Sequence, residues 1–206
     1  KTFTISFWTK LTGQGGFWVS AQPSAGATPF WVINQINDNS GRKLRVNSYN
    51  SGDDIVLIPN GELRDYSSWY HIVVAQDTTQ GTASDRLKIY INGVQETSFN
   101  TETYPVQDYE GSWNNNVQHH IGSSNTASYL DGYMAEFHHI DGTALTPSSF
   151  GETGTYGEWK PIEVSGLTYG TNGFYLSFAG GGIMSATGGN STATDGSYKA
   201  ASFTAD

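Results

Sequence analysis

Short runs of alternating apolar and polar residues, separated by stretches rich in Gly, Asn, Asp and Ser, recur along most of the chain. In the first run Phe3, Ile5 and Phe7 fall on one side of an extended segment, as in a strand with one buried face. Similar runs lie at 17–20, 30–36, 42–49, 54–58, 69–77, 85–92, 94–99, 117–122 and 129–140. Many short strands at this spacing predict an all-β sandwich or barrel.

Three local patterns add detail to this prediction. Asn92-Gly93 between two strand-like runs suits a type I′ turn and predicts a tight hairpin. Thr146 followed by Pro147 predicts a helix of a single turn. In the run 129–140 strict alternation would bury Glu136 and expose Phe137, so a β-bulge near Glu136 is expected to turn Phe137 inward.

Composition excludes several classes of function. Nineteen acidic residues against ten Lys and Arg give a net charge of -9, which opposes binding to nucleic acid or anionic lipid. The chain contains no cysteine, so thiol catalysis and thiolate metal sites are absent. No segment approaches the roughly 18 consecutive apolar residues of a membrane-spanning helix.

The character of the sequence changes near residue 151, where we place the end of the first domain, residues 1–150. Residues 151–206 are interpreted as a linker or extension that contains a tract rich in Gly, Ser and Thr at 179–197. A strand-like run at 173–178 interrupts this extension. Two alternatives remain open for it: a strand added to the first domain, or the start of another domain or a strand exchanged with one.

Four segments in a fixed order resemble the concanavalin A-like, laminin-G-type jelly roll. They are Phe-Thr-Ile-Ser-Phe-Trp at 3–8, Trp-Tyr-His-Ile-Val-Val at 69–74, Leu-Lys-Ile-Tyr-Ile-Asn-Gly at 87–93, and the stretch 121–147 that ends in Ala-Leu-Thr-Pro. The resemblance covers residues 1–150. It implies a two-sheet antiparallel β-sandwich followed by the Gly/Ser/Thr-rich extension.

The run from Phe150 to Phe178 resembles a linker of bacteriophage structural and tail-fibre-like proteins, especially marine ones. This second resemblance implies a virion surface protein in an extracellular setting. Its expected partners are a glycan or host-surface receptor and other virion subunits, and a homo-oligomer is expected.

A candidate carbohydrate site lies in one polar stretch. An aromatic ring can stack on a sugar, and amides can bond its hydroxyl groups. The stretch supplies both kinds of group in Tyr109, Trp113, Asn114, Asn115 and Asn116. The alternative is that Trp113 packs inside the sandwich while the asparagines form turns. Trp8, Trp31 and Trp69 are expected in the core, and Trp159 is expected to clamp the extension onto the domain.

Calcium is the ion that the family resemblance implies, because relatives hold it at a sheet rim through Asp, Asn and carbonyl oxygens. The candidate ligands are Asp38, Asp53, Asp54 and Asp131. The alternative is that these acids serve turns and solubility. The pairs His119-His120 and His138-His139 do not suggest zinc, since neighbours on a strand point to opposite faces, and His71 is expected in the core.

No catalytic group is expected. The Glu-x-Asp-x-x-Glu pattern of glucanases with this fold is missing, and the pairs of acids in the chain do not replace it. The predicted function is therefore a non-catalytic binding module. The first alternative is a ligand-free decoration or assembly protein, and the second is a glucanase-like glycosidase.

Overall fold

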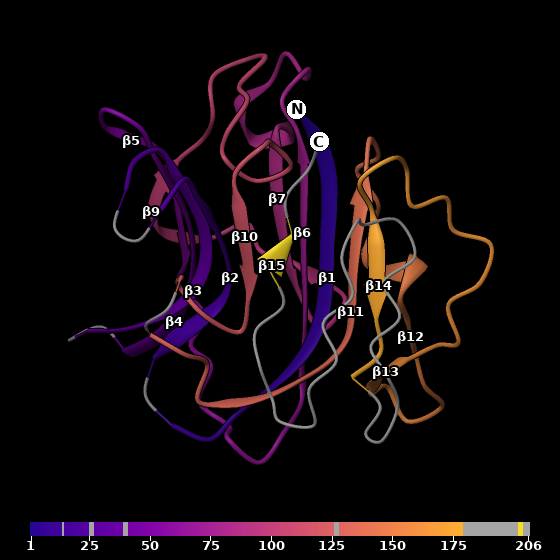
Figure 1. Ribbon diagram of the computed structural model, residues 1–206. Helices are drawn as coiled ribbons and strands as arrows, with labels where there is room; N and C mark the ends of the chain where they lie inside the picture. Colours follow the sequence, from indigo (N-terminus) through magenta and orange to yellow (C-terminus); the bar gives the residue numbers. More distant parts are fainter. Residues whose placement is uncertain (14, 25–26, 39–40, 126–127, 179–201, 204–206) are drawn as a thin grey trace.

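The computed structural model describes residues 1–13, 15–24, 27–38, 41–125, 128–178 and 202–203. Two antiparallel sheets pack face to face, and a short hairpin lies beside them (Figure 1). The prediction of an all-β, two-sheet antiparallel sandwich is confirmed. No helix in this part of the chain is both long enough and apolar enough to cross a bilayer.

The six-stranded sheet has β1 near its centre, in the order β14-β11-β1-β6-β7-β8. Its strands are β1 (Thr2–Leu11), β6 (Tyr70–Asp77), β7 (Leu87–Ile91), β8 (Val94–Gln95), β11 (Gly132–Asp141) and β14 (Phe174–Leu176). β1 pairs with β11 and β6, so segments separated by more than 60 residues lie side by side.

The seven-stranded sheet has the order β15-β10-β2-β3-β4-β5-β9. Its strands are β2 (Gly16–Gln22), β3 (Phe30–Asp38), β4 (Gly41–Tyr49), β5 (Asp53–Pro59), β9 (Phe99–Thr103), β10 (Gln118–Ile121) and β15 (Ser202–Phe203). The separate hairpin consists of β12 (Gly151–Thr153) and β13 (Trp159–Pro161).

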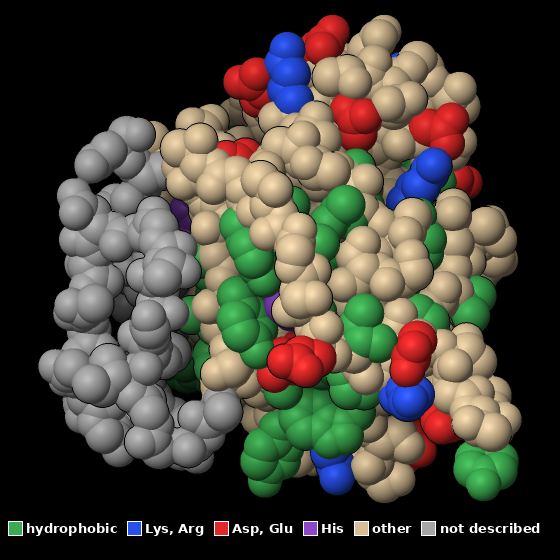
Figure 2. Space-filling model, turned by 90° about the vertical axis from the view of Figure 1, so that its right-hand side faces the viewer, with side chains coloured by type: hydrophobic (Ala, Val, Ile, Leu, Met, Phe, Trp, Pro, Cys, Tyr) green, Lys and Arg blue, Asp and Glu red, His purple; other side chains and the backbone are tan. Residues whose placement is uncertain are grey.

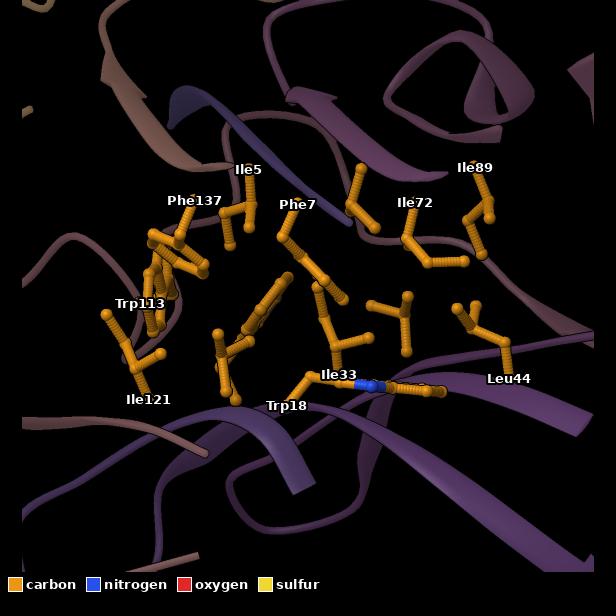
Figure 3. Close-up of a cluster of buried hydrophobic side chains, with 14 of the residues drawn as sticks. Ile5, Phe7, Trp18, Ile33, Leu44, Ile72, Ile89, Trp113, Ile121 and Phe137 are labelled. Atoms are coloured by element: carbon orange, nitrogen blue, oxygen red, sulfur yellow. The ribbon is translucent and has the colours of Figure 1, made fainter. Parts of the chain in front are cut away.

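The main core fills the space between the sheets (Figure 3). Phe3, Ile5 and Phe7 point into it from β1, as their alternation predicts. Trp31 lies in this core, as predicted, and Trp18 joins it there. The remaining two predicted core tryptophans behave differently. Trp8 is buried on the opposite face of β1, and Trp69 is 42% exposed, so its placement in the core was wrong.

The local patterns are confirmed. Asn92 and Gly93 both have positive φ, 49° and 82°, in the hairpin between β7 and β8. At the predicted bulge, Glu136 has φ 50° and the register of β11 against β1 shifts, which turns Phe137 fully inward. A single 3-10 turn spans Pro147–Ser149. Thr146 precedes it without making a capping hydrogen bond from its side chain.

The extension forms a second apolar layer on the outer face of the six-stranded sheet, the face that points away from the main core. Val73 and Ile140 from the sheet pack with Phe150, Val164 and Leu167. β14 adds a strand to this sheet by pairing with β11, so the first alternative for the run 173–178 is correct. Figure 2 shows this side of the molecule, where apolar side chains extend from the middle to the lower part.

The boundary near residue 151 falls inside this packed layer. Phe150 is buried, and residues 151–178 share their apolar contacts with the sheet. The division of the chain into two domains stays a prediction. The tract 179–197 lies outside the described residues.

Trp159 fixes the hairpin of the extension onto the sheet. Its indole Nε1 donates a hydrogen bond to Nδ1 of His71 at 2.9 Å, and the two rings stack with centroids 6.0 Å apart. The ring also lies so close to Gly93 and Gly151 that a Cβ at either position would come within 2.7 Å of it. These contacts agree with the predicted clamp.

Replacing Trp159 by alanine is expected to lower the free energy of unfolding by about 3 kcal/mol. The substitution removes the packed ring and leaves Nδ1 of His71 buried without its donor. Tyr156→Ala is a matched control, because Tyr156 is 94% exposed in the same hairpin and should cost less than about 0.5 kcal/mol. Urea unfolding measures both variants, and equal costs would contradict the clamp.

Candidate functional site

The predicted carbohydrate stretch is mostly built into the fold. Trp113 is 3% exposed and lies in the main core, beside Phe137 and Ile121 in Figure 3. Its Nε1 donates to Nδ1 of His139 at 3.4 Å. The prediction that Trp113 offers a ring to a sugar is therefore wrong, because the ring faces the sandwich rather than solvent. The alternative, in which Trp113 packs inside, is correct.

The other members of the stretch differ in accessibility. Tyr109 is half-buried, and its hydroxyl bonds to Ser48 at 2.7 Å and to Asp54 at 3.2 Å. Asn114 donates from Nδ2 to Oδ1 of Asp141 at 2.7 Å, so its amide is used in holding the loop. Asn115 and Asn116 are exposed. No aromatic ring of the stretch stands free beside them.

The predicted calcium ligands do not converge. Asp54 contacts Tyr109, whose carbonyl accepts from Thr78 near the start of β1. Asp131 accepts from Thr12, just past the end of β1. These acids therefore lie at opposite ends of a ten-residue strand and cannot bind one ion together.

The other two predicted ligands add no cluster. Asp53 accepts a long hydrogen bond from Asn47 at 3.5 Å, and the side chain of Asp38 is outside the described residues. Among the described residues, no three His, Asp or Glu side chains are grouped so that they could hold a metal ion. These observations do not test whether the protein binds calcium.

Ser6 and His71 form a buried pair that resembles a nucleophile and its base. Ser6 Oγ lies 2.8 Å from Nε2 of His71. The indole N–H of Trp159 can only donate, so Nδ1 of His71 accepts this hydrogen bond. The proton of the neutral His71 ring is therefore on Nε2, which donates a hydrogen bond to Ser6. A ring in this tautomer cannot take a proton from the serine. The space beside Ser6, Trp8 and His138 also has no room for a water molecule. The pair is structural.

An open groove of about 430 Å³ lies where β7 and β8, at the edge of one sheet, face β9 at the edge of the other. We call it the edge groove. Hydroxyl groups of Ser84 and Thr97 and the buried Leu87 contribute to its surface. The side chains that matter chemically are those of Asp85, Lys88, Gln95, Glu96, Glu102 and Tyr104.

Burial, hydrogen bonds and one ion pair determine the charges of the polar groups in the edge groove. Burial, and then the hydrogen bond with Glu102, raise the pKa of Tyr104 to about 12. Burial also raises the pKa of Glu96. Lys88 pairs with Asp85 at 3.0 Å, which leaves Glu96 and Glu102 without a cationic partner among the described residues. The groove thus presents one aromatic ring, acceptors and an amide, with net negative charge.

Sequence reasoning missed this groove. Glu96, Glu102 and Tyr104 come from the connection between two strands and from an edge strand, where nothing local distinguishes them from solvated residues. A sequence signal was nevertheless present: the four residues that follow Phe99 in the strand Phe99–Thr103 are all polar. The structure shows these four residues exposed, as in a strand at the edge of a sheet. The run predicted at 94–99 had merged two strands that the structure separates.

The two facing antiparallel sheets place the protein in the class of two-sheet β-sandwiches. Residues 1–150 match the family described as the concanavalin A-like lectin/glucanases superfamily. The chain belongs to this superfamily, and the resemblance seen in the sequence is confirmed at this level.

One solved structure similar to this chain is a native heptameric SAP-like pentraxin from Limulus polyphemus. It is 16% identical, with a TM-score of 0.46, and the match covers 70% of this chain and 65% of that one. The chain therefore spans less than two thirds of the pentraxin. No curated protein matches the sequence.

Proposed function

We propose that the protein is a non-catalytic glycan-binding module and that the edge groove is its binding site. The observation that carries this proposal is the combination of the Tyr104 ring with carboxylate, amide and hydroxyl groups in one groove of about 430 Å³. Sugars offer an apolar C–H face to a ring and hydroxyl groups to such acceptors and donors. A volume of this size accommodates a short oligosaccharide.

The charge of the groove selects among glycans. Asp85, Glu96 and Glu102 face the single cation Lys88 in the groove, and the whole chain carries a net charge of -9. Sulfated, phosphorylated or sialylated sugars would meet repulsion from these carboxylates. The proposed ligands are therefore neutral oligosaccharides.

Replacing Tyr104 by alanine is expected to weaken glycan binding at least tenfold, because the stacking ring is lost. A glycan array with neutral, sialylated and sulfated members tests this with wild type, Tyr104→Ala and the distant exposed control Tyr156→Ala. Tyr104 also packs against the core, so Glu102→Gln, which keeps the shape of an exposed side chain, is a second variant expected to weaken binding. Binding unchanged in both variants would refute the groove as the site.

A glycosidase is the second candidate, because two carboxyl groups, Glu96 and Glu102, line the same groove. A raised pKa of the kind that burial gives Glu96 suits a general acid. Hydrolysis of a soluble glucan by wild type but not by Glu96→Gln would overturn the non-catalytic proposal. A ligand-free decoration protein is the other alternative, and it predicts an array without any signal.

The setting of the module is part of the proposal. An extracellular place on a virion surface, with contacts to other virion subunits and a homo-oligomer, rests on the resemblance of the run from Phe150 to Phe178 alone. The family match and the pentraxin likeness add nothing to it. Calcium binding likewise stays a prediction, and a calcium titration of thermal stability tests it.

A further inference from the structure

The outer face of the six-stranded sheet consists of successive rows that cross β11, β1 and β6. Paired residues of neighbouring strands point to the same face, so the registers of these strands define each row. One row holds His138, Ser6 and Val73, and the next holds Ala135, Trp8 and His71. Phe150, together with Val164 and Trp159 of the extension, packs on these two rows.

In the last row the two aromatic side chains are exposed. Lys10 of β1 pairs with Tyr133 of β11. On the other side of β1, Thr9 pairs with Tyr70 of β6, so the same antiparallel register places Trp69 beside Lys10. We call Tyr133, Lys10 and Trp69 the end row. Tyr133 is 60% exposed and Trp69 is 42% exposed. Lys10 forms no ion pair with any residue that the structure describes.

The end row crosses three neighbouring strands on the outer face of the sheet. Adjacent strands lie about 4.8 Å apart, so the two aromatic residues stand roughly 10 Å apart with the lysine between them. A ligand that crosses all three strands would meet a ring, a hydrogen-bond donor and a second ring in succession. An extended chain of sugars offers matching apolar faces and oxygen acceptors along its length.

A protein partner fits this surface less well. The centres of protein interfaces are depleted in charged residues, whereas the end row has a lysine at its middle. Stable interfaces also need about 800 Å² from each partner, and the extension already covers the neighbouring rows. The end row is therefore small and amphipathic, which suits a narrow polymer rather than a second copy.

We propose that the end row is a second carbohydrate-contact surface, which binds a neutral polysaccharide chain across the strands. This inference rests on the proposed function and extends it, because the edge groove would hold a short oligosaccharide while the end row would hold a long chain. Neutral rather than acidic polysaccharide is expected because of the net charge of -9. Two sites on one module would raise the apparent affinity for a polymer that reaches both.

The test is retention of the purified protein by insoluble cellulose, chitin and β-1,3-glucan. At least one of these polymers should retain the wild type, and the double variant Trp69→Ala/Tyr133→Ala should be retained at least tenfold less. Lys10→Gln should weaken retention by a smaller factor. Tyr156→Ala, which removes an exposed ring elsewhere, should behave as wild type. All replaced side chains are partly or fully exposed, so unchanged thermal unfolding verifies the fold.

The outcomes separate the two sites. The double variant should keep its signals for short oligosaccharides on the glycan array, which depend on Tyr104 and not on the end row. A wild type that no polymer retains, or a double variant retained equally well, overturns the end row as a binding surface whatever the array shows. A wild type that is dimeric by light scattering and a double variant that is monomeric would also overturn it, because a second copy would then be the occupant.

Discussion

Replacing Trp113 by alanine is expected to lower the free energy of unfolding by about 3–5 kcal/mol, the cost typical of deleting a large buried ring. The indole is 3% exposed and packs against Trp31 and His119 at centroid distances of 5.6 and 4.8 Å. It also donates to His139. Alanine would leave a cavity and remove the donor at once.

Urea unfolding followed by tryptophan fluorescence measures this loss. Asn115→Ala is the matched control, since Asn115 is exposed two residues away and should cost less than about 0.5 kcal/mol. A cost below about 1 kcal/mol for Trp113→Ala would contradict the buried placement. The result also bears on glycan experiments, because lost binding in Trp113→Ala would report unfolding rather than a missing sugar contact.

Acidification is expected to destabilise the protein strongly between about pH 6 and pH 4.5. Burial lowers the pKa of His71 to about 3, with a smaller effect of His138. Burial also lowers the pKa of His138 and of His139 to about 4. The unfolded chain binds protons at these rings near the ordinary value of about 6.5, whereas the folded protein does not.

The direction of the pH effect follows from proton linkage. Because the unfolded state binds more protons below pH 6.5, the free energy of unfolding is highest above that pH and falls as the pH decreases toward the folded pKa values. Each of the three histidines contributes up to about 1.4 kcal/mol per pH unit in this window. The summed contribution of the three histidines is large relative to the free energy of unfolding of a whole domain, which is typically about 5–15 kcal/mol.

Urea unfolding at pH 7.5, 6.0, 5.0 and 4.5 measures this slope. His138→Phe is the most useful control, because it keeps a ring for the stacking on Tyr175 but cannot titrate. Its slope should be smaller than that of wild type by about one proton. A free energy of unfolding that stays constant down to pH 4.5 would show that these rings are accessible to protons in the folded state.

Local features of the fold could be predicted because they depend on consecutive residues. The alternation of Phe3, Ile5 and Phe7 identifies an inward face without knowledge of any neighbour. Asn92-Gly93 requires only its own backbone angles, and the conflict between Glu136 and Phe137 shows within one strand that a bulge is needed. The structure confirms each of these points.

The candidate site could not be predicted in the same way. Glu96 follows β8 at the edge of the six-stranded sheet, and Tyr104 follows β9 at the edge of the seven-stranded sheet. They line one groove only because these two edges face each other. The placement of Trp113 failed for a related reason. Its polar neighbours suggested a surface loop, but the ring turns back between the sheets, where it meets Trp31 from a distant strand.

The tryptophans show what the sequence by itself determined and what was left to the tertiary structure. The alternation of apolar and polar residues placed Trp8 and Trp31 in strands and predicted which neighbouring side chains point to the same face, because side chains in a strand alternate with a period of two. It could not predict that residues more than 140 positions later pack beside Trp8 and help to bury it, or that Trp69 stays 42% exposed. Those outcomes depend on strand order and on long-range packing, which bring together residues that no local pattern connects.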